Sequence, residues 1–413
     1  MSLSSIRMRP TRFTSEEVEA CVGGIGARKA GMPGLREHDG LLRENWYIAG
    51  LSKDLSASVS GLLSTVVYET PMVIYRDPKG DLQAVIDRCL HRGAKLSEGA
   101  CAGGQLRCPY HGWTYGAGGR LCEVPSEGPL AKREAAAVSE KAWRLSSFPV
   151  SEQDGVIWVW MGEGAPASGP SWRFPHAGES EWTGYFMVTD FHNEVTHLVE
   201  NFMDVPHTVY VHDKWFRNRR EIKVPITVEL GRSNRQAAGQ PGGQAADQPR
   251  VLVTYDQPGD SIGFSSKVLN PDGHPMVHTD EFIFPNITRV DYRFGDRGYV
   301  INSQCTPMGR YHTRVYTWIA YRLFPGVIGR MVHRFLARPM AFYTRQVIEQ
   351  DVDIMKNQGA NLLRLDEQGA GLPFRSTAAD ELHIAIERLR ELGRSGDERL
   401  KNIAWTKERE IWI

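Results

Sequence analysis

The stretch from Arg88 to Tyr115, RCLHRGAKLSEGACAGGQLRCPYHGWTY, decides the fold of the N-terminal part of the chain. It contains two Cys/His pairs, Cys89 with His91 and Cys108 with His111. Two thiolates and two imidazoles can bind zinc, or an iron–sulfur cluster in which two cysteines hold one iron and two histidines the other. A zinc finger usually places one ligand pair on a helix, whereas here each pair mixes Cys with His and ends a strand at a loop with glycine. The pattern therefore favours a [2Fe–2S] cluster.

The order Cys-x-His, sixteen residues, then Cys-x-x-His within CPYHGW resembles the Rieske [2Fe–2S] proteins, and the HGW run resembles their oxygenase branch. High-potential Rieske proteins of respiratory complexes carry an extra disulfide-forming cysteine in each cluster loop, and CLHRGA and CPYH contain none. The resemblance implies that the two Cys/His pairs bind the cluster. Cys101 and Cys122 lie outside these loop positions, and we interpret them, like Cys21 and Cys305, as structural.

A second motif lies in ENFMDVPHTVYVH, residues 200–212, where His207 and His212 are five residues apart. On a regular helix their side chains would point about 140° apart, unlike the zinc-binding histidines at i and i+4 of some metalloproteases. Pro206 breaks regular helical geometry just before His207. Rieske oxygenases carry a mononuclear iron held by two histidines and one carboxylate, and their motif of Asp followed by His-x4-His is similar to this stretch. The resemblance implies that His207 and His212 bind Fe(II).

The third iron ligand is expected in the C-terminal stretch RQVIEQDVDIMKNQ, residues 345–358. The branch of the family that includes vanillate O-demethylase and dicamba monooxygenase carries an aspartate in such a helix, preceded by an acidic residue. Asp351, which follows Glu349, matches this register. Asp353 stays open as the alternative ligand, and an acidic helix face explains whichever of the two is not bound.

The family resemblance also assigns roles to Asp204 and Asn201, which precede the two histidines. In the family, an aspartate at this place joins an iron-ligand histidine to a cluster-ligand histidine of the neighbouring subunit in a head-to-tail trimer. The resemblance therefore implies a homotrimer in which Asp204 bridges His207 or His212 to His111 of the next protomer. It also places Asn201 near the iron.

The chain divides into an N-terminal extension (residues 1–42), a first domain (43–165) and a second domain (166–413). The extension is polar, with one short helical stretch at 15–25, and short strands with glycine turns indicate an antiparallel sandwich in the first domain. A linker rich in Gly, Pro and Ser follows at 163–175. In the second domain, strands lie between helices expected at 193–203, 331–358 and 379–392, and a low-complexity loop at 234–249 joins two strands. We therefore expect an α+β chain, and the resemblance implies a Rieske domain followed by a helix-grip, START-like catalytic domain.

Charge and hydropathy exclude several classes of partner. Lys+Arg and Asp+Glu both number 49, so no net charge favours nucleic acid or an anionic membrane. No stretch offers about 20 uninterrupted apolar residues, and the N-terminus has no secretory pattern. The stretch 323–343 carries Arg330, His333, Arg334 and Arg338, and we interpret it as an amphipathic helix packed on its own protein rather than on a membrane. We expect a cytoplasmic protein.

The resemblance implies an enzyme that uses O₂ at Fe(II), with electrons from NAD(P)H through a separate reductase or ferredoxin, because the chain shows no GxGxxG motif. Similarity to the branch favours hydroxylation or oxidative demethylation of a small organic substrate, aromatic or polycyclic. Ring cis-dihydroxylation is the alternative, and an electron carrier fused to a START-like ligand-binding domain is the alternative from another class. Arg217, Arg219 and Arg220 could face an acidic ferredoxin, although a solvated surface explains them more simply. The extension and the 234–249 loop depart from the family, so their role and the substrate stay open.

Overall fold

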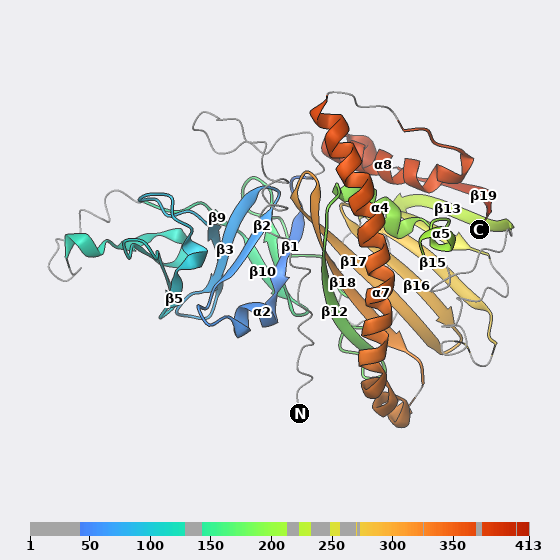
Figure 1. Cartoon of the computed structure of the whole chain (residues 1–413), viewed down its shortest axis with the longest axis horizontal. Coiled ribbons are helices and arrows are strands. Elements are labelled where there is room, and N and C mark those ends of the chain that lie inside the picture. Colours follow the sequence, from blue (N-terminus) through green and yellow to red (C-terminus); the bar gives the residue numbers. More distant parts are fainter. Residues whose placement is uncertain are drawn as a thin grey trace.

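A computed structural model of the chain describes residues 42–128, 143–212, 223–232, 248–256, 270, 273–324, 326–368, 374–401 and 403–412. Residues 1–41, with the helical stretch at 15–25 and Cys21, lie outside the described residues, as do Arg217, Arg219, Arg220 and nearly all of the 234–249 loop. Two bodies lie side by side, one built from the elements β1 to β11 and the other from a broad sheet crossed by a long helix (Figure 1).

The first body contains three antiparallel sheets, as the short strands predicted. The first sheet holds β1 (Trp46–Leu51), β11 (Val156–Trp160) and β10 (Val150–Gln153), and the helix α2 (Ser52–Ala57) follows β1. The second holds β2 (Leu63–Val67), β3 (Thr70–Arg76), β4 (Leu82–Ile86) and β9 (Ser147–Phe148). The third holds β5 (Ala100–Ala102), β6 (Gln105–Arg107), β7 (Thr114–Tyr115) and β8 (Leu121–Glu123), with short 3₁₀ turns at 96–98, 117–119 and 125–127.

Strand β3 holds these sheets together because both of its faces are buried. Met72 and Ile74 pack with Tyr47 and other residues of the first sheet. Val73 and Tyr75 point the other way and pack among residues of the third sheet and its loops. Alternate residues of one strand therefore belong to two cores, which is the two-residue period of a strand in the middle layer.

The stretch 105–115 forms two short strands joined by a loop. β6 ends at Arg107 and β7 begins at Thr114, and the loop between them carries Cys108 and His111. Gly112 in this loop has φ +71°, which interrupts extended geometry. The loop is thus free to present a cysteine and a histidine beyond the sheet.

The second body is an eight-stranded antiparallel sheet with helices on one face (Figure 1). Its strand order is β12 (Thr183–Phe191), β18 (His312–Arg322), β17 (Arg297–Gly309), β16 (Ile287–Phe294), β15 (Met276–Ile283), β14 (Pro249–Tyr255), β13 (Lys223–Arg232) and β19 (Trp405–Trp412). The helices are α4 (Val195–Met203), α5 (Thr208–Val211), α7 (Gly326–Glu367) and α8 (Glu381–Arg394), with 3₁₀ turns at 378–380 and 398–401. The predicted α+β class is confirmed.

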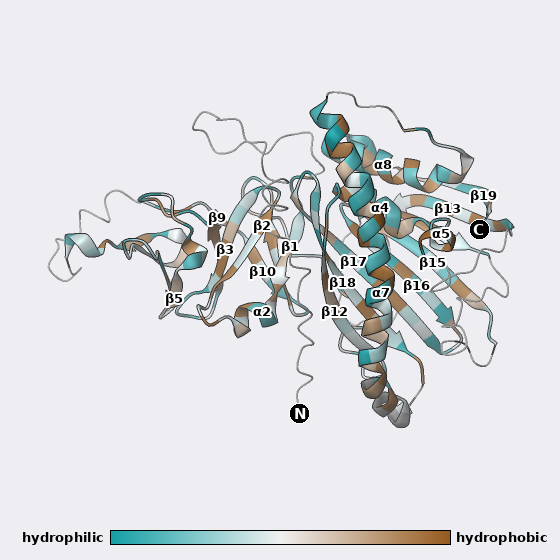
Figure 2. Cartoon of the chain, viewed as in Figure 1, coloured by the Kyte–Doolittle hydropathy of each residue, from teal (hydrophilic) through white to brown (hydrophobic). Residues whose placement is uncertain are grey.

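Helix α7 extends beyond its predicted bounds and crosses the sheet diagonally (Figure 1). Leu336, Met340 and Ile348 pack against the buried residues of β12, β16, β17 and β18, while Phe335 and Phe342 are exposed. Figure 2 shows hydrophilic and hydrophobic residues alternating along this helix, as expected for a helix with one packed side. None of the helices described is long and apolar enough to cross a membrane.

The first body covers part of the sheet face opposite to the helices. Tyr316 of β18 packs with Ile48, Trp158 and Phe174, and Phe174 comes from the stretch predicted as a linker. The Thr306 hydroxyl donates to the carbonyl of Ile48 at 2.9 Å. Strand β18 is therefore buried on both faces, one toward the first body and one toward α7.

Candidate active site

Two loops at the third sheet present the Cys/His pairs in matching turns. The Gly93 N–H donates to the Cys89 carbonyl at 3.0 Å, and the Gly112 N–H donates to the Cys108 carbonyl at 3.2 Å. Both glycines have positive φ, +75° and +71°, a conformation that glycine adopts without steric cost. Both cysteines are buried, at 2% and 3% exposure. The same five-residue turn therefore places each cysteine at the base of its loop.

The two histidines of these loops lie next to each other near the surface. The His91 and His111 ring centroids are 4.5 Å apart, and His91 stacks on Trp113 with centroids 4.7 Å apart. The Nδ1 atom of His91 is buried and has no hydrogen-bond partner in the structure. A buried, unpaired imidazole nitrogen beside a second imidazole and two buried thiols fits a group bound through two Cys and two His side chains.

Tyr115 supports one of these cysteines from inside the domain. Its hydroxyl accepts a hydrogen bond from the Leu90 N–H at 3.1 Å and lies 3.2 Å from the Cys89 sulfur. Because the hydroxyl accepts from Leu90, its own hydrogen can donate to the sulfur. Burial, followed by the contact with Cys89, raises the pKa of Tyr115, so the side chain stays a neutral donor.

His207 and His212 flank a single helical turn, which accounts for their spacing. α4 ends at Met203, Pro206 follows, and α5 spans only Thr208–Val211 between the two histidines. The two ring centroids are 5.2 Å apart, so both rings reach one place although no long helix joins them.

Asp351 of α7 lies at that place. Its Oδ1 atom is 3.4 Å from His207 Nε2 and 3.2 Å from His212 Nε2, and one ligand atom from each of these three residues lies within 4.8 Å of the others. Burial alone would raise the pKa of Asp351, but the two histidine rings beside the carboxylate outweigh burial and lower the pKa to about 2. Asp353 is exposed and lies outside this group.

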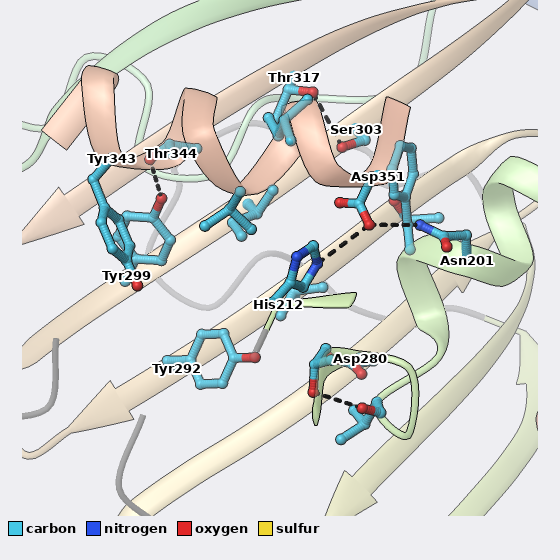
Figure 3. Close-up of a pocket in the computed structure, with 18 of the residues that line it drawn as sticks. Asn201, His212, Asp280, Tyr292, Tyr299, Ser303, Thr317, Tyr343, Thr344 and Asp351 are labelled. Carbon is cyan, nitrogen blue, oxygen red and sulfur yellow. Dashed lines mark hydrogen bonds and ion pairs between the residues drawn. The ribbon is translucent and has the colours of Figure 1, made fainter. Parts of the chain in front are cut away.

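Two neighbours orient the group, and Figure 3 shows one of them, Asn201, beside Asp351. The Asn201 amide donates to Asp351 Oδ1 at 3.3 Å. Gln350 Oε1 lies 2.9 Å from His212 Nδ1, and because an amide oxygen only accepts, the imidazole donates its Nδ1–H there. That hydrogen bond places the ring lone pair of His212 on Nε2, which is the atom that a metal would bind. His207 has neither nitrogen hydrogen-bonded, although both are buried, which also fits a metal ligand.

Asp204 lies on the other side of His207. Its Oδ2 atom is 3.7 Å from His207 Nδ1, and its side chain is 24% exposed. One carboxylate can therefore face the His207 ring and the protein surface at once. The structure contains one chain, so whether Asp204 contacts a neighbouring subunit stays a prediction.

The His207, His212 and Asp351 group lines a cavity of about 340 Å³ between α7 and the sheet. Leu336, Pro339, Met340, Val347 and Ile348 line it from α7. The strands contribute both apolar and hydroxyl groups, and Figure 3 shows Tyr292, Tyr299, Ser303 and Thr317 around the cavity. The cavity is large enough for a small organic molecule next to a bound metal.

Sequence reasoning named the residues that the structure brings together at each candidate site, but it missed three of their neighbours. Gln350, Tyr115 and Asp280, an acidic residue of β15 that lines the cavity, were not identified. Gln350 could have been found, because it adjoins Asp351 in a helix expected to carry a ligand. Tyr115 and Asp280 reach their sites because the sheets that carry them pack beside segments far away in the sequence, the loop of Cys89 for Tyr115 and helix α7 for Asp280.

Comparison with known proteins agrees with this geometry. Residues 45–139 match the family model for the Rieske [2Fe–2S] domain. The oxygenase component of dicamba O-demethylase from Stenotrophomonas maltophilia is 34% identical over 192 residues, which are 44% of this chain and 53% of that protein. The chloroplastic protein TIC 55 from Arabidopsis thaliana is 33% identical over 225 residues, 52% of this chain and 39% of that protein. The chain thus spans about half or less of the length of these relatives.

Solved structures share the fold over most of the chain. Dicamba monooxygenase bound to dicamba superposes with a TM-score of 0.66 at 19% identity, covering 87% of this chain and 99% of that one. NdmA from Pseudomonas putida CBB5 with caffeine gives 0.62 at 20% identity, covering 86% and 92%. At such identities the likeness concerns the fold.

Proposed function

We propose that this chain, which carries a Rieske [2Fe–2S] domain in the fold of the Rieske oxygenases, is the oxygenase component of a system that hydroxylates or oxidatively demethylates a small organic substrate. The observation that carries the proposal is the convergence of His207, His212 and Asp351 at the wall of a largely apolar cavity. A carrier of electrons alone would have no use for two imidazoles and a carboxylate in a ligand-sized cavity.

The donor set fits iron. Two imidazoles and one carboxylate form the facial triad of non-heme iron oxygenases, and when bound there Fe(II) supplies the activation of O₂. Cys89, Cys108, His91 and His111 would hold the [2Fe–2S] cluster, which supplies electrons one at a time.

The chain's own residues position the substrate and keep water away. Gln350 fixes the tautomer of His212, and Asn201 holds the Asp351 carboxylate by a hydrogen bond. Apolar side chains of α7 and the strands enclose the substrate beside the triad. They keep bulk water out of the site, which prevents side reactions with water. Ser303 and Thr317, hydrogen-bonded to each other at 3.3 Å, add hydroxyls to the cavity wall.

The separation of the two sites supports electron transfer between subunits. Figure 1 places β5 of the cluster-binding sheet at the far end of the first body, whereas α4 and α5 of the iron site lie in the second body. We therefore extend the proposal to a homotrimer in which Asp204 joins His207 to the cluster of a neighbouring subunit. NAD(P)H would supply the electrons through a separate reductase or ferredoxin.

The decisive experiment is reconstitution of the full chain, with its iron and sulfide contents measured, together with a reductase and ferredoxin of the class that serves such oxygenases. A panel of aryl methyl ethers, N-methyl compounds and steroids is supplied with isotopically labelled O₂, and products are identified by mass. A hydroxylated product that carries the label, or a demethylated product with formaldehyde, is expected. His207→Ala serves as the control and should abolish product while retaining the cluster absorption.

Three results would overturn the proposal. The first is zinc in place of iron and sulfide. The second is a product from His207→Ala equal to that from the unchanged chain, and the third is a cis-diol as the product, which would favour the dioxygenase alternative.

The domain limits 43–165 and 166–413 and a cytoplasmic location stay predictions.

A further inference from the structure

The cavity floor is built from rows of side chains that cross the sheet. Strand pairing aligns Tyr255, His278, Tyr292, Tyr299 and Tyr321 in one row, from β14 to β18. The same pairing aligns a second row, which lies two residues from the first on each strand and consists of Val253, Asp280, Val290, Ile301 and Ile319. Because alternate residues share a face, both rows point to the same side of the sheet. The second row is apolar apart from one carboxylate.

That carboxylate, Asp280, is held in place by the aromatic row. His278 Nε2 lies 2.9 Å from Asp280 Oδ1, and the two residues are 0% and 2% exposed. The His278 ring lies between two tyrosines, stacked on Tyr255 with centroids 4.3 Å apart and on Tyr292 at 4.4 Å. Stacking on both faces fixes the imidazole, and the imidazole fixes the carboxylate.

The packing of the sheet does not require this arrangement. A buried carboxylate in a row of Val and Ile costs free energy that an apolar residue would not. His278 Nδ1 adds to the cost because it is buried without a hydrogen-bond partner. Yet Asp280 lines the cavity, on the sheet side that faces α7 in Figure 3. Asp280 therefore has a ligand-facing position and spare acceptor capacity, because a carboxylate offers about four lone-pair sites.

The charges around the cavity define what can bind next to Asp280. The ionisable side chains that line it, among the described residues, are Asp204, Asp280, Asp351, His207, His212 and three tyrosines, with no Lys or Arg. All but Asp280 and the tyrosines belong to the proposed iron site or its bridge. An anionic group on a substrate would thus meet a buried carboxylate and no protein cation, whereas an O–H or N–H group would find an acceptor.

We propose that Asp280, positioned by His278, is the specificity-determining residue of the cavity and accepts a hydrogen bond from an O–H or N–H group on an otherwise apolar substrate. The substrate class is therefore a neutral or cationic hydroxy or amino compound, and carboxylates and sulfonates are rejected. This inference rests on the proposed function, because the cavity is a substrate site only if the chain is an oxygenase. It concerns binding, however, and can be tested without turnover.

The test measures affinity in a matched ligand series. The full chain, loaded with cluster and iron but without reductase, is titrated calorimetrically with naphthol, naphthylamine, methylnaphthalene and naphthoate that carry the group at one ring position. The hydroxyl and amine compounds should bind roughly 10- to 100-fold tighter than methylnaphthalene, as expected for a hydrogen bond to a charged acceptor. Naphthoate should bind weakest. Equal affinity of naphthol and methylnaphthalene, tightest binding of naphthoate, or no binding of any member would overturn the inference.

Variants assign the preference to Asp280. Asp280→Asn keeps the shape and one acceptor oxygen but loses the charge, so the preference for naphthol over methylnaphthalene should fall to a few-fold at most, about that of a neutral hydrogen bond. Glu281→Gln, which changes the next carboxylate of β15, one that bonds to Arg250 and does not line the cavity, is the matched control and should keep the preference of the unchanged chain. A full preference in Asp280→Asn, with cluster absorption and circular dichroism unchanged, would refute the role of the carboxylate. The ligand series on the unchanged chain decides the matter if the variant does not fold.

Failure of this inference and failure of the proposed function give different results. If naphthol binds preferentially but no labelled product forms with any reductase, the function is wrong and the role of Asp280 stands. If labelled products form equally from carboxylates and from compounds without a donor, the function stands and the role of Asp280 is wrong.

Discussion

Gln350 and Asp351 are neighbours on α7, and their side chains contact opposite nitrogens of the same ring. Gln350 Oε1 lies 2.9 Å from His212 Nδ1, and Asp351 Oδ1 lies 3.2 Å from His212 Nε2. One turn of one helix thereby supplies a proposed iron ligand and the group that fixes the tautomer of another. The orientation of His212 depends on α7 rather than on the short α5 that precedes it.

Replacing Gln350 should therefore weaken iron binding without removing a ligand. We expect Gln350→Leu to lower the iron affinity roughly 10- to 100-fold, because His212 loses the acceptor that holds its Nδ1–H. Iron content after dialysis against a graded chelator measures this. Gln346→Leu, one turn earlier and bonded to Glu349 instead, is the matched control and should bind iron normally. Equal iron retention by both variants would show that Gln350 does not orient the ligand.

The choice between Asp351 and Asp353 can be made with a pair of alanine variants. Asp351→Ala removes the carboxylate that lies beside both histidines, and we expect loss of the mononuclear iron with an intact cluster signal. Asp353→Ala changes an exposed residue two positions further on, and both metals should remain. Metal analysis combined with electron paramagnetic resonance of the reduced cluster separates the two sites. Iron retained by Asp351→Ala and lost by Asp353→Ala would reverse the assignment.

Tyr115 should tune the cluster. Its hydroxyl is 3.2 Å from the Cys89 sulfur, and a hydrogen bond to a ligand sulfur stabilises the reduced, more negative cluster. We expect Tyr115→Phe to lower the midpoint potential by about 50 mV, which corresponds to one hydrogen bond of about 1 kcal/mol in a one-electron couple. Redox titration followed by absorption measures the shift. An unchanged potential in a variant with a normal cluster spectrum would mean that this hydroxyl does not bond to the sulfur.

The sequence predicts the two Cys/His pairs and the His207/His212 pair because the residues of each pair lie close together along the chain. Cys89 with His91, and Cys108 with His111, each lie within one turn, and Pro206 signalled the break before His207. The resemblance to the family then linked these loops to a carboxylate in a distant helix, and the structure places Asp351 there. Composition and spacing alone could not have made that connection, since about 140 residues separate His212 from Asp351.

The remaining features depend on strand register, which a single sequence does not reveal. Asp280 meets the cavity because β15 pairs with β14 and β16 in one register, and a shift by one residue would turn it to the other face. Strand β19 was also missed. It is an edge strand in which only Ile411 is buried, so its sequence shows almost no apolar pattern.

Asp204 should matter for electron transfer and not for metal content. Its Oδ2 atom lies 3.7 Å from His207 Nδ1, and its partial exposure leaves it able to contact a neighbouring subunit. We expect Asp204→Asn to keep cluster and iron but to slow product formation in a single turnover by at least about 100-fold, because the neutral amide cannot hold a charged bridge between two imidazoles. Rapid-quench kinetics measures the product, and light scattering should show a trimer for both proteins.

The control for this prediction is Asp380→Asn. Asp380 is an acidic residue near Asp204, but its carboxylate accepts a hydrogen bond from the Thr377 N–H rather than facing His207. It should leave the single-turnover rate unchanged. A normal rate in Asp204→Asn would exclude the bridge, and a monomer in solution would exclude transfer between subunits. The proposed cluster and iron sites lie in different bodies of one chain. A monomer that turned over at full rate would therefore require an electron-transfer route inside the chain, and the separation of β5 from α5 in Figure 1 argues against such a route.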